Sequence, residues 1–248
     1  MYYFVSDIHL GAGDEARARR TEESFVSWLD AAAADARTIY ILGDLFDFWF
    51  EYRHVVPRGF VRTLAKLAEL TSRGIRIVFL TGNHDMWVRD YLARECGIEV
   101  RVRPVVEELC GRRVMLAHGD NMNIGRRYGL RLMNGMFRSR VLRFLFSWLL
   151  HPDLAMSFGH WWSGKSRKSH SAVDSDGKCT EQLIDYARKY AAGDGSVTTF
   201  IFGHMHSPRD YSSNGLRVVL LGHWQGDAAP AYAVMDDTGS ITLKTYGR

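Results

Sequence analysis

Cysteine is scarce in this chain. The 248 residues include three cysteines, Cys96, Cys110 and Cys179, at widely separated positions. So few scattered thiols exclude a disulfide framework and a structural zinc cluster, because both need several cysteines at suitable spacings. Such cysteine usage is typical of a reducing compartment, and we expect a cytoplasmic protein.

Targeting and membrane-spanning segments are also missing. The chain enters an apolar, strand-like run at Tyr2 with no basic segment and apolar stretch before it, so we expect no signal peptide. The densest apolar run, residues 141–150, is about half the ~20 residues that a membrane-spanning helix needs. It is long enough to lie on a membrane or to hold an acyl chain.

Acidic residues are nearly absent from one region. Between Arg126 and Lys168, nine Lys or Arg residues stand against one acidic residue, Asp153. The whole chain carries a net charge of only +4, so the basic excess is local. A nucleic acid, an anionic membrane surface or a phosphorylated substrate would explain this asymmetry, and so would a solvated face.

The remaining composition, 46% hydrophobic and 24% charged, is that of an ordinary globular protein. At this length we expect a single domain over residues 1–248, with residues 121–175 inserted within it.

Five stretches share one design, in which a short apolar run of strand-forming residues leads into polar residues that bind metals. The polar parts are Asp7-Ile8-His9, Gly43-Asp44, Gly82-Asn83-His84-Asp85, His118-Gly119-Asp120 and Gly203-His204-Met205-His206. Open α/β sheets bind ligands at the carboxyl ends of their strands, so we expect these side chains to meet at one site. An extended backbone would place Asp7 and His9 on the same face of the first strand.

Helical patterns separate the strand-like runs. We expect helices over residues 21–36, 57–72 and 180–190, and a hairpin over residues 105–115. The alternation of strands and helices predicts an α/β fold, and the hairpin adds antiparallel strands, so the sheets should be mixed.

Residues 121–175 break this alternation. Residues 128–150 predict one or two helices rich in aromatic and aliphatic side chains, and residues 164–175, small and polar, predict a loop. We interpret the segment as a helical cap beside the site, with an apolar groove for lipid. Packing as part of the core is the alternative for part of it.

The ligand-type residues at the strand ends are Asp7, His9, Asp44, Asn83, His118, His204 and His206. Mixed imidazoles and carboxylates favour Mn, Fe, Zn, Co or Ni over calcium or thiolate-bound zinc. The set is too large for one small ion and favours two ions that share a carboxylate. Such pairs activate a water and clamp a phosphoryl group.

The motifs D-x-H, G-D-x-x-D, G-N-H-D, H-G-D and G-H-x-H, in this order over nearly the whole chain, resemble the complete signature of the calcineurin-like metallophosphoesterases. The resemblance implies an α/β fold, a four-layer sandwich of two mixed β-sheets flanked by helices, with two metal ions at the strand ends. It also implies the ligand sets. Asp7, His9, Asp44 and His206 would hold the first ion; Asp44, Asn83, His118 and His204 would hold the second, so Asp44 would be the bridge.

The same resemblance gives His84 a catalytic role. This histidine would hydrogen-bond the transferring phosphoryl oxygen or protonate the leaving group. Asp47, three residues after Asp44, resembles the carboxylate that orients this histidine. A structural turn histidine is the alternative for His84.

Within the superfamily, S-D-I-H-L-G, I-L-G-D-L-F-D-F-W and the inserted segment resemble the UDP-2,3-diacylglucosamine hydrolase family. That resemblance implies cleavage of a diacylated UDP-glucosamine to UMP and the acylated sugar 1-phosphate, in lipid A biosynthesis. The chain departs from that family's pattern, which has Arg and Glu where this chain has His84 and Asp47. A divergent enzyme acting on another UDP-sugar, nucleotide or phosphodiester is therefore the alternative.

The cap supplies the expected substrate contacts. Phe144 and Trp148 are predicted to contact acyl chains, and Arg126, Lys165, Arg167 and Lys168 to contact phosphates. We expect two divalent ions, most readily Mn²⁺. We also expect a peripheral position of the protein on the inner face of a bacterial inner membrane. No obligate protein partner is expected.

Two other classes of function are disfavoured. A nuclease would suit the basic insertion, but its arginines are interleaved with more apolar residues than a phosphate-tracking groove requires, so we expect no nucleic-acid partner. A non-catalytic scaffold would be marked by lost metal ligands, and none is lost here.

Overall fold

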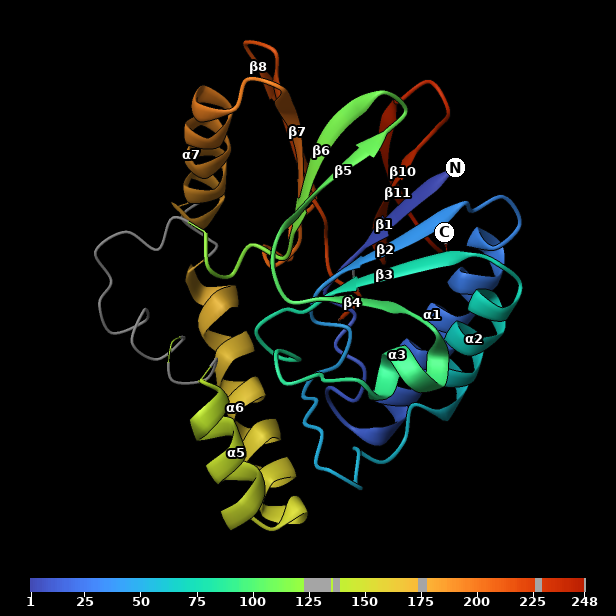
Figure 1. The fold of residues 1–248 in the computed structure, drawn as a ribbon, viewed down its shortest axis with the longest axis vertical. Coiled ribbons are helices and arrows are strands. Elements are labelled where there is room, and N and C mark those ends of the chain that lie inside the picture. The colour runs from blue at the N-terminus through green and yellow to red at the C-terminus, as the bar shows by residue number, and fades with distance from the viewer. Residues whose placement is uncertain (123–134, 136–138, 174–177, 226–228, 248) are drawn as a thin grey trace.

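The structure is a computed structural model that describes residues 1–122, 135, 139–173, 178–225 and 229–247. Two β-sheets face each other in it, with helices on both outer faces (Figure 1). This is the predicted α/β arrangement of two mixed sheets flanked by helices. None of the helices in these ranges is long and apolar enough to cross a membrane.

The first sheet has six strands in the order β11-β10-β1-β2-β3-β4. They are β1 (Tyr2–Val5), β2 (Thr38–Leu42), β3 (Arg76–Leu80), β4 (Glu99–Arg101), β10 (Ala231–Met235) and β11 (Ile241–Thr245). Strands β1 to β4 run parallel, whereas β10 runs antiparallel to β1 and β11 antiparallel to β10.

The second sheet has five strands in the order β5-β6-β7-β9-β8. They are β5 (Val105–Leu109), β6 (Arg112–Ala117), β7 (Val197–Phe202), β8 (Arg209–Ser213) and β9 (Leu216–Leu220). Strands β6, β7 and β9 run parallel, and β5 and β8 are antiparallel edge strands. The predicted hairpin is β5–β6, so both sheets are mixed.

Apolar side chains on both faces of each sheet explain the layers. Phe4, Tyr40, Val114 and Ile201 belong to the core between the sheets and are fully buried. The outer face of the first sheet packs against α1 (Glu15–Ala32), α2 (Val61–Ser72) and α3 (Tyr91–Cys96). The outer face of the second sheet packs against α7 (Lys178–Gly193).

Two helices lie outside the layers of this sandwich. Helices α5 (Arg140–Leu149) and α6 (Pro152–Val173) lie side by side beyond the end of the sheets where β1, β2 and β3 finish (Figure 1). The predicted loop over residues 164–175 is therefore wrong for residues 164–173, which continue α6. Gly and Ser weaken a helix by only about 1 kcal/mol per residue or less, and the rest of α6 outweighs that cost.

Two other boundaries differ from the sequence patterns. Helix α1 begins six residues before the expected start, because Asp14 accepts a hydrogen bond from the backbone N–H of Arg17 at 2.8 Å and caps the helix there. The segment between Asp14 and Thr21 is mostly charged, so it gave no apolar stripe. Helix α2 begins at Val61, after the left-handed Phe60.

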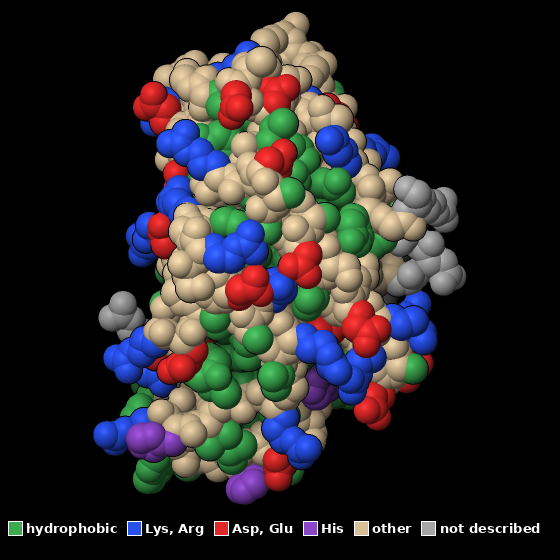
Figure 2. Space-filling view, turned by 90° about the vertical axis from the view of Figure 1, so that its right-hand side faces the viewer, with side chains coloured by type: hydrophobic (Ala, Val, Ile, Leu, Met, Phe, Trp, Pro, Cys, Tyr) green, Lys and Arg blue, Asp and Glu red, His purple; other side chains and the backbone are tan. Residues whose placement is uncertain are grey.

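Charged side chains are mixed on the surface. On the face drawn in Figure 2, Lys and Arg side chains alternate with Asp and Glu, and no continuous basic stripe crosses that face. The arrangement on this face resembles an ordinary solvated surface and offers no track for a phosphate backbone.

Candidate metal centre

Five parallel strands deliver the predicted ligands from their carboxyl ends. Strands β1, β2 and β3 of the first sheet lead to Asp7, Asp44 and Asn83, and β6 and β7 of the second lead to His118 and His204. The two sheets thus contribute to one site at their common end, as the apolar runs predicted.

The backbone at this end is strained. Asp7, His9, Asp44, His204 and His206 have φ of 54°, 49°, 52°, 69° and 56°, in the left-handed region that non-glycine residues rarely adopt. Each such residue costs about 1 kcal/mol or more, a cost that clusters at functional sites. The expectation that Asp7 and His9 share a face of an extended strand is wrong, because β1 ends at Val5 and both residues lie in the turn that follows.

Hydrogen bonds hold this turn against its neighbour. The backbone N–H of Asp7 donates to the carbonyl of Gly43 at 3.1 Å, and that of His9 donates to the carbonyl of Asp44 at 2.9 Å. The two ligand-bearing loops are therefore held side by side before any ion binds.

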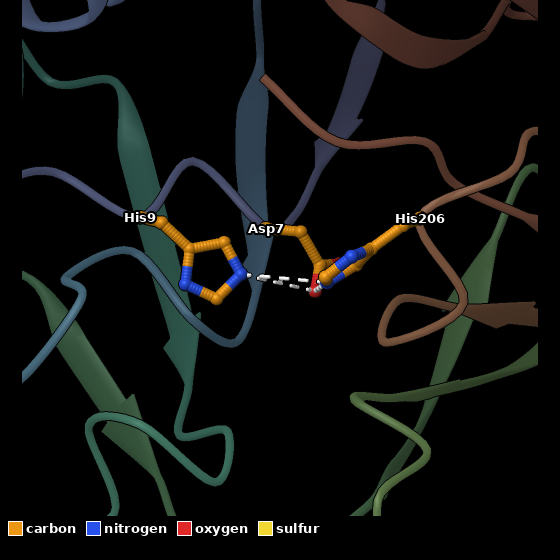
Figure 3. Close-up of side chains that lie close together, drawn as sticks. All are labelled: Asp7, His9 and His206. Carbon is orange, nitrogen blue, oxygen red and sulfur yellow. Dashed lines mark hydrogen bonds and ion pairs between the residues drawn. The ribbon is translucent and has the colours of Figure 1, made fainter. Parts of the chain in front are cut away.

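Asp7, His9 and His206 form the first cluster (Figure 3). Oδ1 of Asp7 lies 3.2 Å from Nε2 of His206 and 3.8 Å from Nε2 of His9, and the two imidazole nitrogens are 3.4 Å apart. One carboxylate oxygen and two imidazole nitrogens that converge in a buried space are a donor set that suits a transition-metal ion.

Asp44, His118 and His204 form the second cluster. Oδ2 of Asp44 lies 3.3 Å from Nε2 of His118, and Oδ1 of Asn83 lies 3.1 Å from the same nitrogen. The other ring nitrogen of His118 donates to the carbonyl of Leu42 at 2.8 Å, so Nε2 faces the cluster.

Asp44 lies between the two clusters. Its Oδ2 is 3.8 Å from Nε2 of His9 as well as 3.3 Å from Nε2 of His118. A bridging carboxylate needs this position, and Asp44 was predicted to be the bridge.

The carboxylates at the centre are ionised. Burial alone would raise the pKa of Asp7, but the hydrogen bond and charge of His206 outweigh it and hold that pKa well below its usual range. Burial likewise opposes ionisation of Asp44, but the charges of His118 and His84 lower its pKa further than burial raises it. Both side chains are therefore in the form that binds metal.

Glycines let the loops approach this closely. A Cβ atom on Gly82 would overlap Oδ1 of Asp44, and one on Gly43 would overlap the ring of His118. Gly43 also has φ +87°, so glycine is required there twice over.

His84 lies beside both clusters but is held differently from the ligands. Its backbone N–H donates to Oδ1 of Asp44 at 2.9 Å, and its Nδ1 donates to the backbone carbonyl of Asp47 at 2.8 Å. Nε2 then faces the centre, 3.9 Å from Oδ2 of Asp44. The carboxylate of Asp47 lies 3.9 Å from Nδ1, so the main chain of Asp47 makes the closer contact.

Helix α6 adds two residues that sequence reasoning missed. Ser163 is buried, its hydroxyl lies 3.0 Å from Nδ1 of His84, and it donates to the carbonyl of Asp47. His160 places Nδ1 3.7 Å from Oδ2 of Asp47. No local motif could have found either residue, since both reach the site through the packing of a distant helix.

An aromatic hollow lies between α6 and the centre. We use this name for the space lined by Phe48, Trp87, Phe158 and Trp162, which also borders Asn83 and His84. Helix α6 can lie this close because Gly159 has no Cβ atom. A Cβ atom there would overlap the ring of Phe48. From α5, Phe146 packs on Phe50 and Trp87 with ring centroids 5.0 Å apart in each pair.

Comparison with known proteins places the chain in a family. The sequence model of the calcineurin-like phosphoesterases matches residues 2–208. This chain belongs to the calcineurin-like phosphoesterase family. The family and its relatives make it a metal-dependent hydrolase, as the motifs predicted.

Individual relatives of this phosphoesterase cover most of its length. A UDP-2,3-diacylglucosamine hydrolase from Porphyromonas gingivalis is 37% identical over 95% of this chain and 94% of its own. A protein of the same name from Pseudomonas aeruginosa is 31% identical over 89% of this chain and 90% of its own. Among solved structures, an archaeal phosphodiesterase covers 98% of both chains with a TM-score of 0.48 and 11% identity.

The structure describes the side chains of only some of the predicted substrate-binding residues. Phe144 and Trp148 lie on the exposed side of α5 and are 64% and 74% exposed. Lys165, Arg167 and Lys168 belong to α6, but the structure does not describe the side chains of these three residues. Arg126 lies outside the described residues.

One further histidine was missed although the sequence carried a signal for it. His223 follows β9 by three residues, in the same strand-end design as the ligands, and its ring stacks on that of His206 at 5.3 Å. Burial, together with the neighbouring charge of His206, lowers the pKa of His223, which favours the neutral ring against the first cluster.

Proposed function

We propose that this phosphoesterase hydrolyses UDP-2,3-diacylglucosamine to UMP and 2,3-diacylglucosamine 1-phosphate, the reaction implied by the names of its relatives. The observation that carries the proposal is the aromatic hollow beside the metal centre. It borders His84 and Asn83 directly, so an acylated sugar in it would present its phosphate to the site.

In this proposal the ligands divide as the motifs suggested. Asp7, His9, Asp44 and His206 hold one ion, and Asp44, Asn83, His118 and His204 hold the other, with Mn²⁺ the proposed metal. When bound, such ions supply positive charge that activates water and offsets the charge of the phosphoryl group.

The chain's own contribution centres on His84. The bond from Nδ1 to the carbonyl of Asp47 fixes the ring so that Nε2 faces the reacting phosphoryl group. From there a protonated His84 can donate to a phosphoryl oxygen or to the oxygen of the departing sugar phosphate. Ser163 and Asp47 maintain this ring orientation.

Residues 121–175 act as the cap in this proposal. Helix α6 lines the aromatic hollow. The exposed apolar side chains of α5 and α6 provide the means for peripheral contact with the inner membrane, where an acylated substrate resides. Phe144 and Trp148 are the proposed lipid contacts of α5, and Arg126, Lys165, Arg167 and Lys168 the proposed phosphate contacts.

The test is release of UMP by manganese-loaded protein given UDP-2,3-diacylglucosamine. UDP-N-acetylglucosamine and bis-p-nitrophenyl phosphate are the control substrates, because neither carries long acyl chains for the aromatic hollow. Strong preference for the diacylated compound supports the proposal. Turnover of the controls alone would support hydrolase activity but contradict the proposed substrate, and would point to another UDP-sugar or phosphodiester.

A further inference from the structure

A second hollow adjoins the metal centre, and the proposed chemistry has not used it. We call it the arginine hollow. Arg101 at the end of β4 lines one part with Arg103 and Pro104, which follow it, and His118, Asp120 and Asn121 after β6 line another. Its cavity volume is about 60 Å³ and it is partly open to solvent, so a ligand there would be only partly enclosed.

The two hollows meet at the second cluster. Asn83 borders the aromatic hollow and His118 borders the arginine hollow, and the side chains of these two predicted ligands are 3.1 Å apart. A diphosphate held at the centre therefore has one space available for each of its two substituents.

The two spaces differ in chemistry. The aromatic hollow offers Phe48, Trp87, Phe158 and Trp162, which suit an acylated sugar. The arginine hollow offers guanidinium groups, a carboxylate and an amide instead. Guanidinium groups bind phosphate, and carboxylate and amide side chains bind ribose hydroxyls and the polar edge of a base.

The two arginines are not equivalent. Arg101 donates to Oε2 of Glu99 at 2.9 Å, and Glu99 is also bound by Arg76 at 2.8 Å, so Arg101 is already part of an ion-pair network. Arg103 is exposed and makes no ion pair with any residue in the described ranges. Its guanidinium group is therefore available to a ligand at little cost.

We propose that the arginine hollow binds the nucleoside monophosphate half of the substrate, with Arg103 on its phosphate and Asp120 and Asn121 on its ribose or base. The inference rests on the proposed function, because it takes UMP to be the half that the aromatic hollow does not hold. It gives the substrate a direction, with the acyl chains under α6 and the nucleotide beside β4.

Binding of UMP to the metal-loaded full chain tests this directly by calorimetry. Loss of one charge-assisted contact in Arg103→Ala should raise the dissociation constant for UMP roughly tenfold. Arg112→Ala is the matched control, since Arg112 is exposed at the opposite end of β6. Uridine, which lacks the phosphate that Arg103 contacts, should bind equally to all three proteins, and circular dichroism should show that all three are folded.

Each result separates the subsite from the proposed function. Equal UMP affinity in the three proteins would overturn the nucleotide subsite, while release of UMP from UDP-2,3-diacylglucosamine by the wild type would leave the function standing. Equal weakening of UMP and uridine in Arg103→Ala would also overturn it, because Arg103 would then not act through the phosphate. A wild type that neither cleaves the substrate nor binds UMP would overturn both.

Discussion

At the scale of single residues, Asp44 links the parts of the centre, because its carboxylate contacts residues of both clusters and the backbone of His84. One carboxylate oxygen accepts the backbone N–H of His84 at 2.9 Å, and the other lies near ligand nitrogens of both clusters. The same side chain thus joins the two proposed ion sites and fixes the loop that carries His84.

Asp44→Ala should therefore lose both metal ions and all turnover, because one carboxylate serves two sites. Metal analysis of the purified variant, reconstituted with Mn²⁺, measures the loss. Asp30→Ala, on the surface of α1, is a control that removes a carboxylate outside the centre. A variant that retained both ions would contradict the bridging role.

His84 should behave in the opposite way. Its ring is held by the carbonyl of Asp47 and faces the centre without being one of the predicted ligands. His84→Ala should keep its metal content and lose about 10²- to 10⁴-fold in kcat, the range typical of a removed general acid. Metal analysis beside kinetics on bis-p-nitrophenyl phosphate checks both halves. Loss of metal would make His84 a ligand instead.

Most residues of the centre could be predicted because their signals are local. Each ligand motif follows directly on an apolar strand, and the end of a strand fixes where the next two or three residues lie. The positive φ values of Asp7 and His9 could not be predicted, since they depend on hydrogen bonds to the neighbouring loop at Gly43 and Asp44.

At the scale of elements, α6 is the part of the molecule that the sequence described least well. Its last residues were predicted as a loop on composition, whereas Ser163 reaches His84 and His160 reaches Asp47 through its packing. Tertiary contacts of this kind override local propensity, and a single sequence does not carry them.

Ser163 makes α6 part of the active site. Ser163→Ala removes the hydroxyl between His84 and Asp47 and should lower kcat roughly fivefold to tenfold, the value of one hydrogen bond, with metal content unchanged. Ser157→Ala is the matched control, an exposed serine of the same helix bonded to the carbonyl of Asp153. Equal kinetics in both variants would mean that Ser163 only packs.

Gly159 should be the contact on which docking of α6 depends. Alanine usually stabilises a helix by about 1 kcal/mol over glycine, but here its Cβ would overlap the ring of Phe48. Gly159→Ala should therefore lower the free energy of unfolding by about 1–3 kcal/mol, the usual cost of overpacking. Gly193→Ala on α7, where a Cβ meets nothing within 4 Å, should leave it unchanged or raise it. Chemical denaturation measures both, and equal stability would show that α6 can shift.

At the scale of the whole molecule, apolar exposure is concentrated on the cap. Among the described side chains, Phe144, Trp148 and Leu149 of α5 and Leu154 and Trp161 of α6 are each at least 59% exposed. The sandwich carries few comparable side chains, one of which is Val61 of α2, 72% exposed. Large exposed apolar groups gathered in one region indicate a surface that contacts lipid or another partner.

The proposed lipid contact can be separated from catalysis. Each aromatic side chain removed from an interface costs about 1.5–3 kcal/mol, so the double variant Phe144→Ser and Trp148→Ser should bind vesicles of phosphatidylethanolamine and phosphatidylglycerol at least roughly a hundredfold more weakly. Val61→Ser, an equally exposed change on α2, should bind as the wild type does. Sedimentation with vesicles measures all three. Because Phe144 and Trp148 lie outside the aromatic hollow, the double variant should still turn over bis-p-nitrophenyl phosphate, and unchanged vesicle binding would mean that another face meets the membrane.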